Sequence, residues 1–267
     1  MPLISLIINA DNRQGYLSDK STVGDFGAGS LQGVRSKDLL TYGIQNKINF
    51  FKGYDIQCVV YLDVHESLPD ELLKEITDIV ESCGNNSRVV LAQHSKDKYR
   101  WNDHLYINAI KYAEGEYTCH MDMDCCAYKK EDFDIVKGYM ELLDNGYKYI
   151  CQSWDKVGDD MWWASTRFFI CKTETLDLEW LANNLTTPVM GKHTPCVEHL
   201  LAVKEGEGRV LYPPRDDSNY IIFCWASYFS GLMKRLNNLP YEEVIKYIKD
   251  CGLYGTHDIL AKSITNE

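Results

Sequence analysis

The residues best suited to chemistry are two aspartates one residue apart, Asp122 and Asp124, at the end of a short strand-like run. Residues two apart on an extended chain point to the same side, so the two carboxylates can face one ligand together. Hard carboxylate oxygens suit Mg²⁺ or Mn²⁺, and phosphate oxygens and water usually complete the shell of such an ion. An Asp-x-Asp pair can also be turn chemistry or a solvated edge. The metal interpretation makes a nucleotide diphosphate the first ligand to consider.

The composition favours one compact protein and disfavours binding to the phosphate backbone of nucleic acids. The chain has 267 residues, 45% of them hydrophobic, which is enough for a substantial core, and we expect one domain over residues 1–267. The formal net charge is −11. Since nonspecific nucleic-acid affinity depends on Lys and Arg neutralising phosphates, a nucleic-acid partner is disfavoured.

Cysteine usage and hydropathy suggest a compartment. Ten cysteines occur without a secretory leader at the N-terminus, so we expect reduced thiols rather than disulfides. No apolar run approaches the roughly 18 to 20 residues that a bilayer-spanning helix needs. We therefore expect a cytoplasmic protein without a transmembrane segment, and peripheral attachment to a membrane stays open.

The elements that must position the aspartates alternate between strand and helix. Apolar β-prone runs at 3–8, 56–62 and 88–92 are typical of strands buried on both faces of a parallel sheet. Helical spacing of apolar residues at 36–51 and 69–83 connects them. This alternation predicts an α/β fold of the doubly wound type, with a mostly parallel central sheet.

The second half continues the alternation less regularly. A predicted helix leads to Gly115 and the strand that ends in the paired aspartates, so the motif lies at the carboxyl end of a strand, where ligands of open α/β sheets bind. The further predicted helices are 102–113 and 131–143, and the further strands are 147–154, 165–171 and 209–212.

Three segments resemble one family in its own order. They are MPLISLIINADN at 1–12, NAIKYAEGEYTCHMDMD at 108–124 and EHLLAVKEGEGRVLYP at 198–213. They are similar to the first strand, the metal-binding strand and the acidic helix of the GT-A glycosyltransferases, especially the family 2 type. The resemblance implies a GT-A-like, Rossmann-type α/β/α sandwich of the nucleotide-diphospho-sugar transferase kind. It also implies a nucleotide-sugar and metal-binding half at 1–128 and an acceptor-binding half with the C-terminal tail at 129–267.

The same resemblance implies a metal-dependent transfer of a sugar from a nucleotide-diphosphate sugar to an acceptor hydroxyl. Asp124 matches the residue that ligates Mn²⁺ or Mg²⁺ directly, and Asp122 matches the one that contacts the ribose or a metal-bound water. His257 resembles a C-terminal histidine that adds a metal ligand. A metal and cationic donors would stabilise the charge that develops on the diphosphate.

The remaining roles also follow from the family pattern. Asn9, Asp11 and Asp63 match positions that contact the base and ribose, and Arg100 could reach the diphosphate. Glu198 matches the general base that would accept the proton of the attacking hydroxyl, which implies inversion at the anomeric carbon. His199 is the alternative base.

Two further clusters have more than one interpretation. Trp162 and Trp163 follow Asp160 in what we expect to be an acidic loop, where they could stack on an acceptor sugar, although tryptophans are more often core. Near the motif, cysteines 119, 125 and 126 and His120 suggest zinc. Their spacing lacks the separated pairs of structural zinc sites, so buried small side chains are the better interpretation.

Two rival functions remain at this level. Nucleotidyltransferases of related fold usually have a Gly-rich loop with a basic residue after the first strand, whereas residues 9–15 contain only Arg13 and one glycine. A catalytically inactive nucleotide-sugar-binding module is the other alternative. The acceptor could be a glycan, a lipid-linked sugar or a small molecule.

Overall fold

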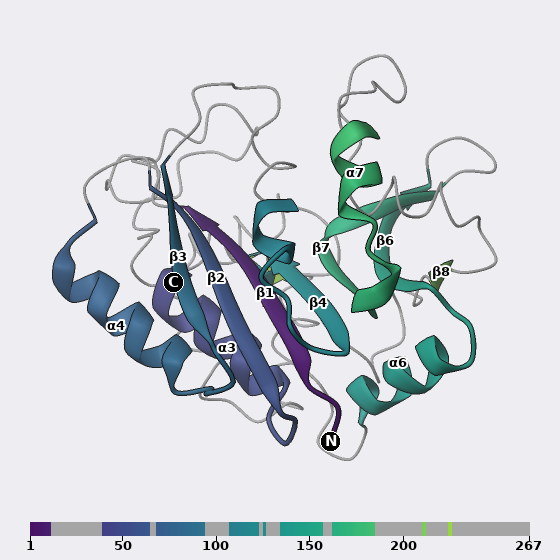
Figure 1. Ribbon diagram of the computed structural model, residues 1–267, viewed down its shortest axis with the longest axis horizontal. Helices are drawn as coiled ribbons and strands as arrows, with labels where there is room; N and C mark the ends of the chain where they lie inside the picture. The colour runs from purple at the N-terminus through teal and green to yellow at the C-terminus, as the bar shows by residue number, and fades with distance from the viewer. Residues whose placement is uncertain are drawn as a thin grey trace, which may run out of the picture.

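A seven-stranded sheet in the order β3-β2-β1-β4-β7-β6-β8 forms the centre of the protein (Figure 1). This computed structural model describes residues 1–11, 39–64, 68–93, 107–122, 125–126, 134–156, 162–184, 210–211 and 224–225. The strands of the sheet are β1 (Ile4–Asp11), β2 (Ile56–Val64), β3 (Arg88–Gln93), β4 (Tyr117–Asp122), β6 (Tyr149–Lys156), β7 (Trp162–Lys172) and β8 (Val210–Leu211). Two short strands, β5 (Cys125–Cys126) and β9 (Cys224–Trp225), pair separately.

The sheet is mostly parallel, as the sequence predicted. β1 pairs in parallel with both β2 and β4, and β2 pairs in parallel with β3. Among the described strands of this sheet, only β7 runs against its neighbours, being antiparallel to β4 and to β6. β1 therefore lies at the centre of a parallel unit, and the carboxyl ends of its two neighbours emerge at the same edge.

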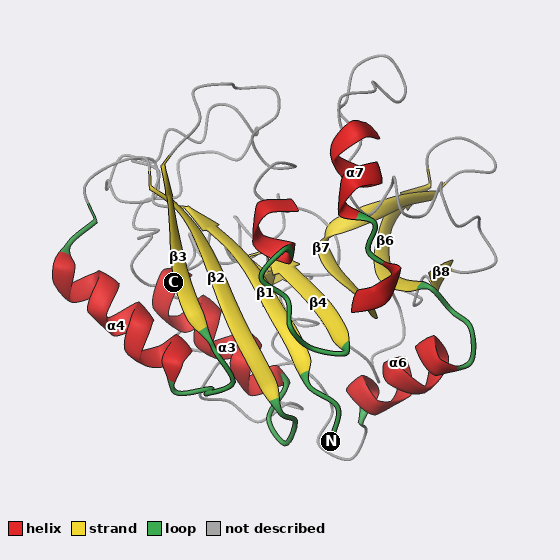
Figure 2. Cartoon of the chain, viewed as in Figure 1, coloured by secondary structure: helices red, strands yellow, loops and turns green. Residues whose placement is uncertain are grey.

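Helices cover both faces of this unit, which confirms the predicted α/β layering. The helices are α3 (Ile44–Phe50), α4 (Asp70–Glu81), α6 (Ile135–Asp144) and α7 (Leu178–Asn184), and residues 107–110 are also helical. Figure 2 shows α3 and α4 together behind the strands β1 to β3, and these two helices contact each other. On the opposite face Ala109 packs with Ile7 and Val59 in one core cluster.

The strand β1 is buried on both sides, which explains its continuous apolar run. Ile4, Leu6 and Ile8 face one way and Ile7 the other, and all four are 0% exposed. Helix α4 instead buries one stripe, formed by Leu72, Ile76 and Val80, and it starts behind a proline with acidic residues in its first turn. Both patterns are local, so the sequence predicted both elements.

Three details differ from the sequence expectations. The predicted helix 36–51 contains a π-helical turn, η2 (Leu39–Gly43), before α3. Helix α7 was not predicted, although Asp177 caps it by accepting a hydrogen bond of 2.9 Å from the Trp180 amide. Trp162 and Trp163 lie in strand β7 rather than in a loop, opposite Lys156 and Asp155 of β6. Register shifts in this pair obscure the strand alternation.

Among the described residues, no helix combines the length and the apolar character that a membrane crossing requires.

Candidate active site at the carboxyl edge of the sheet

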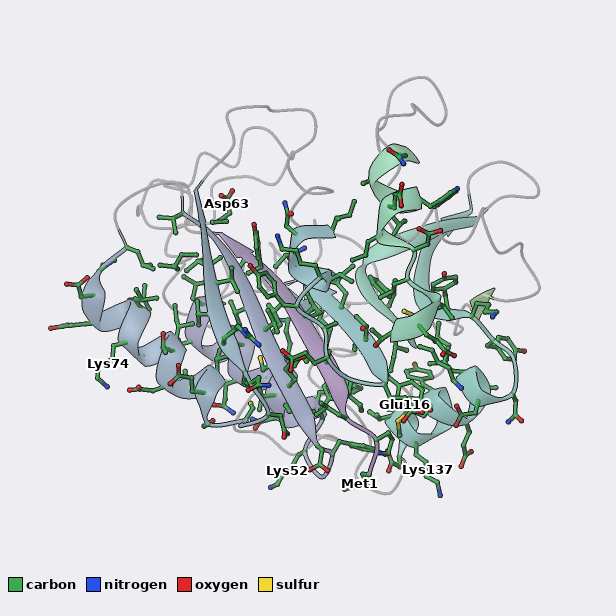
Figure 3. The ribbon with its side chains drawn as sticks, in the orientation of Figure 1. Met1, Lys52, Asp63, Lys74, Glu116 and Lys137 are labelled. Atoms are coloured by element: carbon green, nitrogen blue, oxygen red, sulfur yellow. The ribbon has the colours of Figure 1, made fainter. Side chains whose placement is uncertain are left out.

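Polar residues follow one another along the carboxyl ends of three adjacent parallel strands. Asn9 on β1 occupies the position paired with Asp122 on β4, and Asp11 on β1 is paired with Asp63 on β2. Figure 3 shows Asp63 at this end of the sheet and Glu116, which precedes β4, at the opposite end. The register therefore brings four sequence-predicted site residues to one edge, the edge at which open α/β sheets bind ligands.

Asn9 offers hydrogen-bonding capacity that the described part of the protein does not use. Its Nδ2 and Oδ1 atoms are both buried, and neither has a hydrogen-bond partner in the part of the chain that the structure describes. Leaving a buried polar group unsatisfied costs about 1 to 3 kcal/mol, so such exceptions need an explanation. An amide with a spare donor and a spare acceptor at a ligand-binding edge is suited to recognising a polar ligand.

Asp63 is a desolvated carboxylate at the end of β2. Its residue is only 1% exposed although it lies at the edge of the sheet. Two residues earlier on the same strand, the pKa of Tyr61 is raised by burial and, to a smaller extent, by Tyr112 and by the charge of Asp63. A buried acceptor beside a protonated phenol suits a ligand that presents N–H or O–H groups.

His120 lies on β4, close to this edge of the sheet. It is 0% exposed, lies opposite Ile7 of β1, and stacks on Phe169 of β7 with ring centroids 5.6 Å apart and planes 23° apart. His120 is two positions before Asp122 on the same strand, so the aromatic stack supports the strand that carries the motif.

The zinc alternative gains no support from the described residues. Cys119 is 0% exposed, and burial, with a smaller contribution from the neighbouring Cys171, raises the pKa of its thiol well above the ordinary value. A buried protonated thiol is a poor zinc ligand, since the thiolate is the ligating form. Within the ranges that the structure describes, no three His, Cys, Asp or Glu residues gather into a metal-binding group.

A buried polar network sets the position of β4. The Ser5 hydroxyl donates to Gln57 Oε1 at 2.6 Å and accepts from the amides of Glu114 at 3.0 Å and Gly115 at 2.8 Å. Gln57 also accepts from the Glu114 amide at 3.0 Å and donates to the Tyr112 carbonyl at 3.2 Å. The turn that starts β4 is thus tied to both β1 and β2.

Sequence analysis missed Ser5 and Gln57 as positioning residues. The available signal was a polar residue inside an otherwise apolar strand, at a place where burial requires a partner. Both side chains are 0% exposed, and their partners lie more than fifty residues away along the chain. The sequence alone does not identify such partners.

Gly115 allows the turn to approach β1 closely. A Cβ atom at this position would lie 2.5 Å from the Leu3 carbonyl oxygen and 2.7 Å from the Ser5 amide nitrogen. Both are backbone atoms and cannot move aside independently. The glycine in the family-like Ala-x-Gly-Glu-Tyr segment is therefore required by packing.

The structure describes some of the predicted site residues with their side chains, some by their strand position alone, and others not at all. Asn9 and Asp63 are described with their side chains, whereas Asp11 and Asp122 are placed by their strand positions. Trp162 and Trp163 are likewise placed only as residues of β7. The others lie outside the described residues: Arg100, Asp124, Asp160, Glu198, His199 and His257. Their predicted roles stay predictions.

Comparison with known proteins identifies the fold through structure rather than sequence. No family model matches the chain. No curated protein matches it. Among solved structures, a Bacillus anthracis protein assigned as a glucose-1-phosphate thymidylyltransferase, in complex with sucrose, is similar with a TM-score of 0.52 and 12% identity. This alignment covers 90% of our chain and 96% of the other.

Two further solved structures are similar to a lesser extent. A UDP-glucose pyrophosphorylase complexed with UDP-glucose gives a TM-score of 0.48 at 10% identity, over 89% of this chain and 98% of the other. A mannosyltransferase from Pyrobaculum calidifontis, in complex with GDP-Man and Mn²⁺, gives 0.45 at 14% identity, over 80% of this chain and 55% of the other. The similar structures include both glycosyltransferases and nucleotidyltransferases. The chain has the fold of the nucleotide-diphospho-sugar transferases.

Proposed function

We propose that this protein is a metal-dependent glycosyltransferase that moves a sugar from a nucleotide-diphosphate sugar to an acceptor hydroxyl. The observation that carries the proposal is the register of the sheet. It pairs Asn9 with Asp122 and Asp11 with Asp63 at the carboxyl edge. The fold supports the proposal because it is shared by enzymes that handle activated sugars.

In this proposal the β1–β2 side of the edge binds the nucleoside. The buried Asn9 amide provides a donor and an acceptor, and the buried Asp63 carboxylate accepts from N–H or O–H groups of the base or ribose. Asp11 joins them from the position paired with Asp63. Arg100 would meet the diphosphate, where a guanidinium suits bidentate phosphate binding.

The β4 side of the edge would hold the cation. Carboxylate oxygens of Asp122 and Asp124, with the His257 imidazole, form a donor set that suits Mn²⁺ or Mg²⁺. Asp122 is the last residue of the buried strand β4, so its backbone is held by pairing with β1. When bound, the cation neutralises the charge of the diphosphate leaving group.

Transfer itself would use residues of the second half. Glu198, with His199 as the alternative, accepts the proton of the acceptor hydroxyl while the oxygen attacks the anomeric carbon and the carbon–phosphate-oxygen bond breaks. Direct displacement of this kind inverts the anomeric centre. Trp162, Trp163 and Asp160 would bind the acceptor sugar by ring stacking and hydrogen bonds.

The test is a screen of possible nucleotide-sugar donors. The protein is incubated with a panel of nucleotide-diphosphate sugars and Mn²⁺, and release of free nucleoside diphosphate is measured. We expect release with at least one donor, loss of release and of metal-dependent donor binding in Asp124→Asn, and loss of release with retained binding in Glu198→Gln. Asp70→Asn, on the exposed first turn of α4, is the control and should behave as the parent protein.

Two other outcomes identify the rivals. Formation of pyrophosphate from a nucleoside triphosphate and a sugar 1-phosphate, without transfer from any nucleotide sugar, would assign the chain to the nucleotidyltransferases. Metal-dependent donor binding without any turnover would indicate a binding module. Retention of metal-dependent donor binding in Asp124→Asn would refute the metal assignment.

A further inference from the structure

Two cysteines outside the candidate site lie next to each other between α4 and β2. Cys58 is the third residue of β2 and is buried, whereas Cys83 follows the end of α4 and is half-buried. Both are free thiols that interact with each other, and hydrogen bonds join the turn that follows Cys83 to the segment of β2 that contains Cys58. Neither residue has a part in the proposed transfer reaction.

The turn after α4 holds this pair in place. Gly84, Asn85 and Asn86 adopt left-handed conformations with φ of 67°, 51° and 59°, which reverses the chain sharply. The Asn85 side chain then donates to the Ile56 carbonyl at 3.1 Å. The Ser87 hydroxyl accepts from the Cys58 amide at 2.8 Å. The turn that follows Cys83 is thus fastened to the strand that carries Cys58.

The two thiols differ in reactivity. The hydrogen bond from Cys58 lowers the pKa of Cys83, and the same bond together with burial raises the pKa of Cys58. The ammonium of Lys47, a residue that is 0% exposed, partly offsets the increase at Cys58. Because the thiolate is the nucleophile, Cys83 is the thiol that reacts first, and it is also the more accessible one.

We propose that Cys58 and Cys83 form a reversible thiol–disulfide site that reacts with low-molecular-weight disulfides such as oxidised glutathione. The Cys83 thiolate attacks one sulfur of the small disulfide, which breaks its S–S bond and releases one thiolate. Cys58 then loses its proton to solvent, attacks Sγ of Cys83 and expels the second small thiolate. The protein loses two electrons and two protons, and one small disulfide becomes two small thiols.

The bond would connect the end of α4 to the strand that carries Asp63. The segment between the two cysteines contains Asp63 at the carboxyl edge of the sheet, so oxidation would close a covalent loop around part of the candidate site. A cross-link of this kind restricts the unfolded chain and usually stabilises the folded one. We therefore expect the oxidised protein to unfold at a higher temperature than the reduced protein.

The two other cysteines whose side chains the structure describes lack this arrangement. Cys171 is 0% exposed, and burial raises the pKa of its thiol to about 12. Cys119 is equally buried, with a raised pKa. These two thiols should stay unreactive while the protein is folded. The labelling rate of Cys171 therefore provides an internal reference for that of Cys83.

Tryptic peptides make the test specific. Cleavage after Lys52, Lys74 and Arg88 gives peptide 53–74, with Cys58 as its one cysteine, and peptide 75–88, with Cys83 as its one cysteine. The full-length protein is reduced, freed of reductant, exposed to oxidised glutathione, trapped with a maleimide and digested without reduction. We expect the two peptides to appear linked by a disulfide, and to separate again after treatment with dithiothreitol.

Variants and labelling rates provide the controls. Cys83→Ser should abolish the linked peptide and leave Cys58 as a free thiol, while Cys171→Ala should retain the link. In the parent protein, iodoacetamide should label peptide 75–88 at least about tenfold faster than peptide 168–172, which contains Cys171. Parent protein in which Cys83 carries only glutathione, or is joined to a different cysteine, would overturn the proposal, as would labelling of both peptides at equal rates.

Discussion

Ser5 on β1 donates a hydrogen bond of 2.6 Å to Gln57 on β2, and both side chains are completely buried. Through the amides of Glu114 and Gly115, the same pair holds the turn from which β4 starts. The candidate metal strand is therefore positioned from its amino end by a polar network, while its carboxyl end carries Asp122.

Ser5→Ala should lower the free energy of unfolding by about 1 to 3 kcal/mol, because the buried Gly115 amide loses the hydroxyl that accepts its hydrogen bond. Chemical denaturation at neutral pH measures the change. Ser82→Ala is the matched control, since that hydroxyl is exposed and bonds only locally to the Ile79 carbonyl. The control should stay within about 0.5 kcal/mol of the parent. Equal effects of the two substitutions would contradict the proposed role of the network.

Gly115→Ala should be strongly destabilising, by about 3 kcal/mol or more, because its Cβ would lie 2.5 Å from the Leu3 carbonyl oxygen. Gly138→Ala, inside α6, adds the same methyl group where no atom lies within 4 Å. Helix propensity favours alanine there, so this control should gain up to about 1 kcal/mol. Thermal unfolding of both variants provides the measurement. A Gly115→Ala protein as stable as the parent would show that the turn can move away from β1.

Asn9→Ala should separate stability from ligand binding. The buried amide has no hydrogen-bond partner among the described residues, so its removal should change the free energy of unfolding by less than about 1 kcal/mol. Donor affinity should fall about tenfold, equivalent to about 1.4 kcal/mol, measured by titration with the nucleotide sugar found in the donor screen. The exposed Asn49→Ala, on α3, serves as the control for binding. A large loss of stability with unchanged affinity would assign Asn9 a structural role.

Asp144 bonds to Tyr117 at the amino end of β4, and its carboxylate should stabilise the protein in a pH-dependent way. Hydrogen bonds from Lys172 and then from Tyr117, both at 2.8 Å, lower the pKa of this carboxyl below its ordinary value. A carboxyl with a lowered folded-state pKa stabilises the protein above its unfolded pKa of about 4, and that contribution disappears as the pH falls through the folded pKa. Because the Asp144 side chain is 52% exposed, solvent screening limits the contribution to about 1 kcal/mol or less.

Asp144→Asn should accordingly be less stable than the parent at pH 7, and the difference should shrink below about pH 4. Unfolding by urea at several pH values between about 2 and 7 measures it. If the difference in the free energy of unfolding between the two proteins stayed constant across this range, ionisation of Asp144 would not be its source.

The sequence by itself determined the elements whose pattern is local. Continuous apolar runs predicted β1, β2 and β3, and the stripe Leu72, Ile76 and Val80 predicted α4. The strands β1 and β2 are buried within the layered sheet as expected, whereas β3 lies at its edge and leaves Leu91 51% exposed. The sequence also placed Asp122 at the end of a strand. With the order of the three family-like segments, this was enough to identify the fold class.

Tertiary structure decided the relationships between distant segments. The pairing of Asn9 with Asp122, the bond from Ser5 to Gln57 and the approach of Cys83 to Cys58 each depend on strand register and on where a helix packs. A one-residue change of register would reverse every side chain of a strand, and no local pattern records which register is formed. The residue types that could form a site were visible in the sequence, but the long-range backbone pairing that assembles them at one edge was determined by the folded sheet.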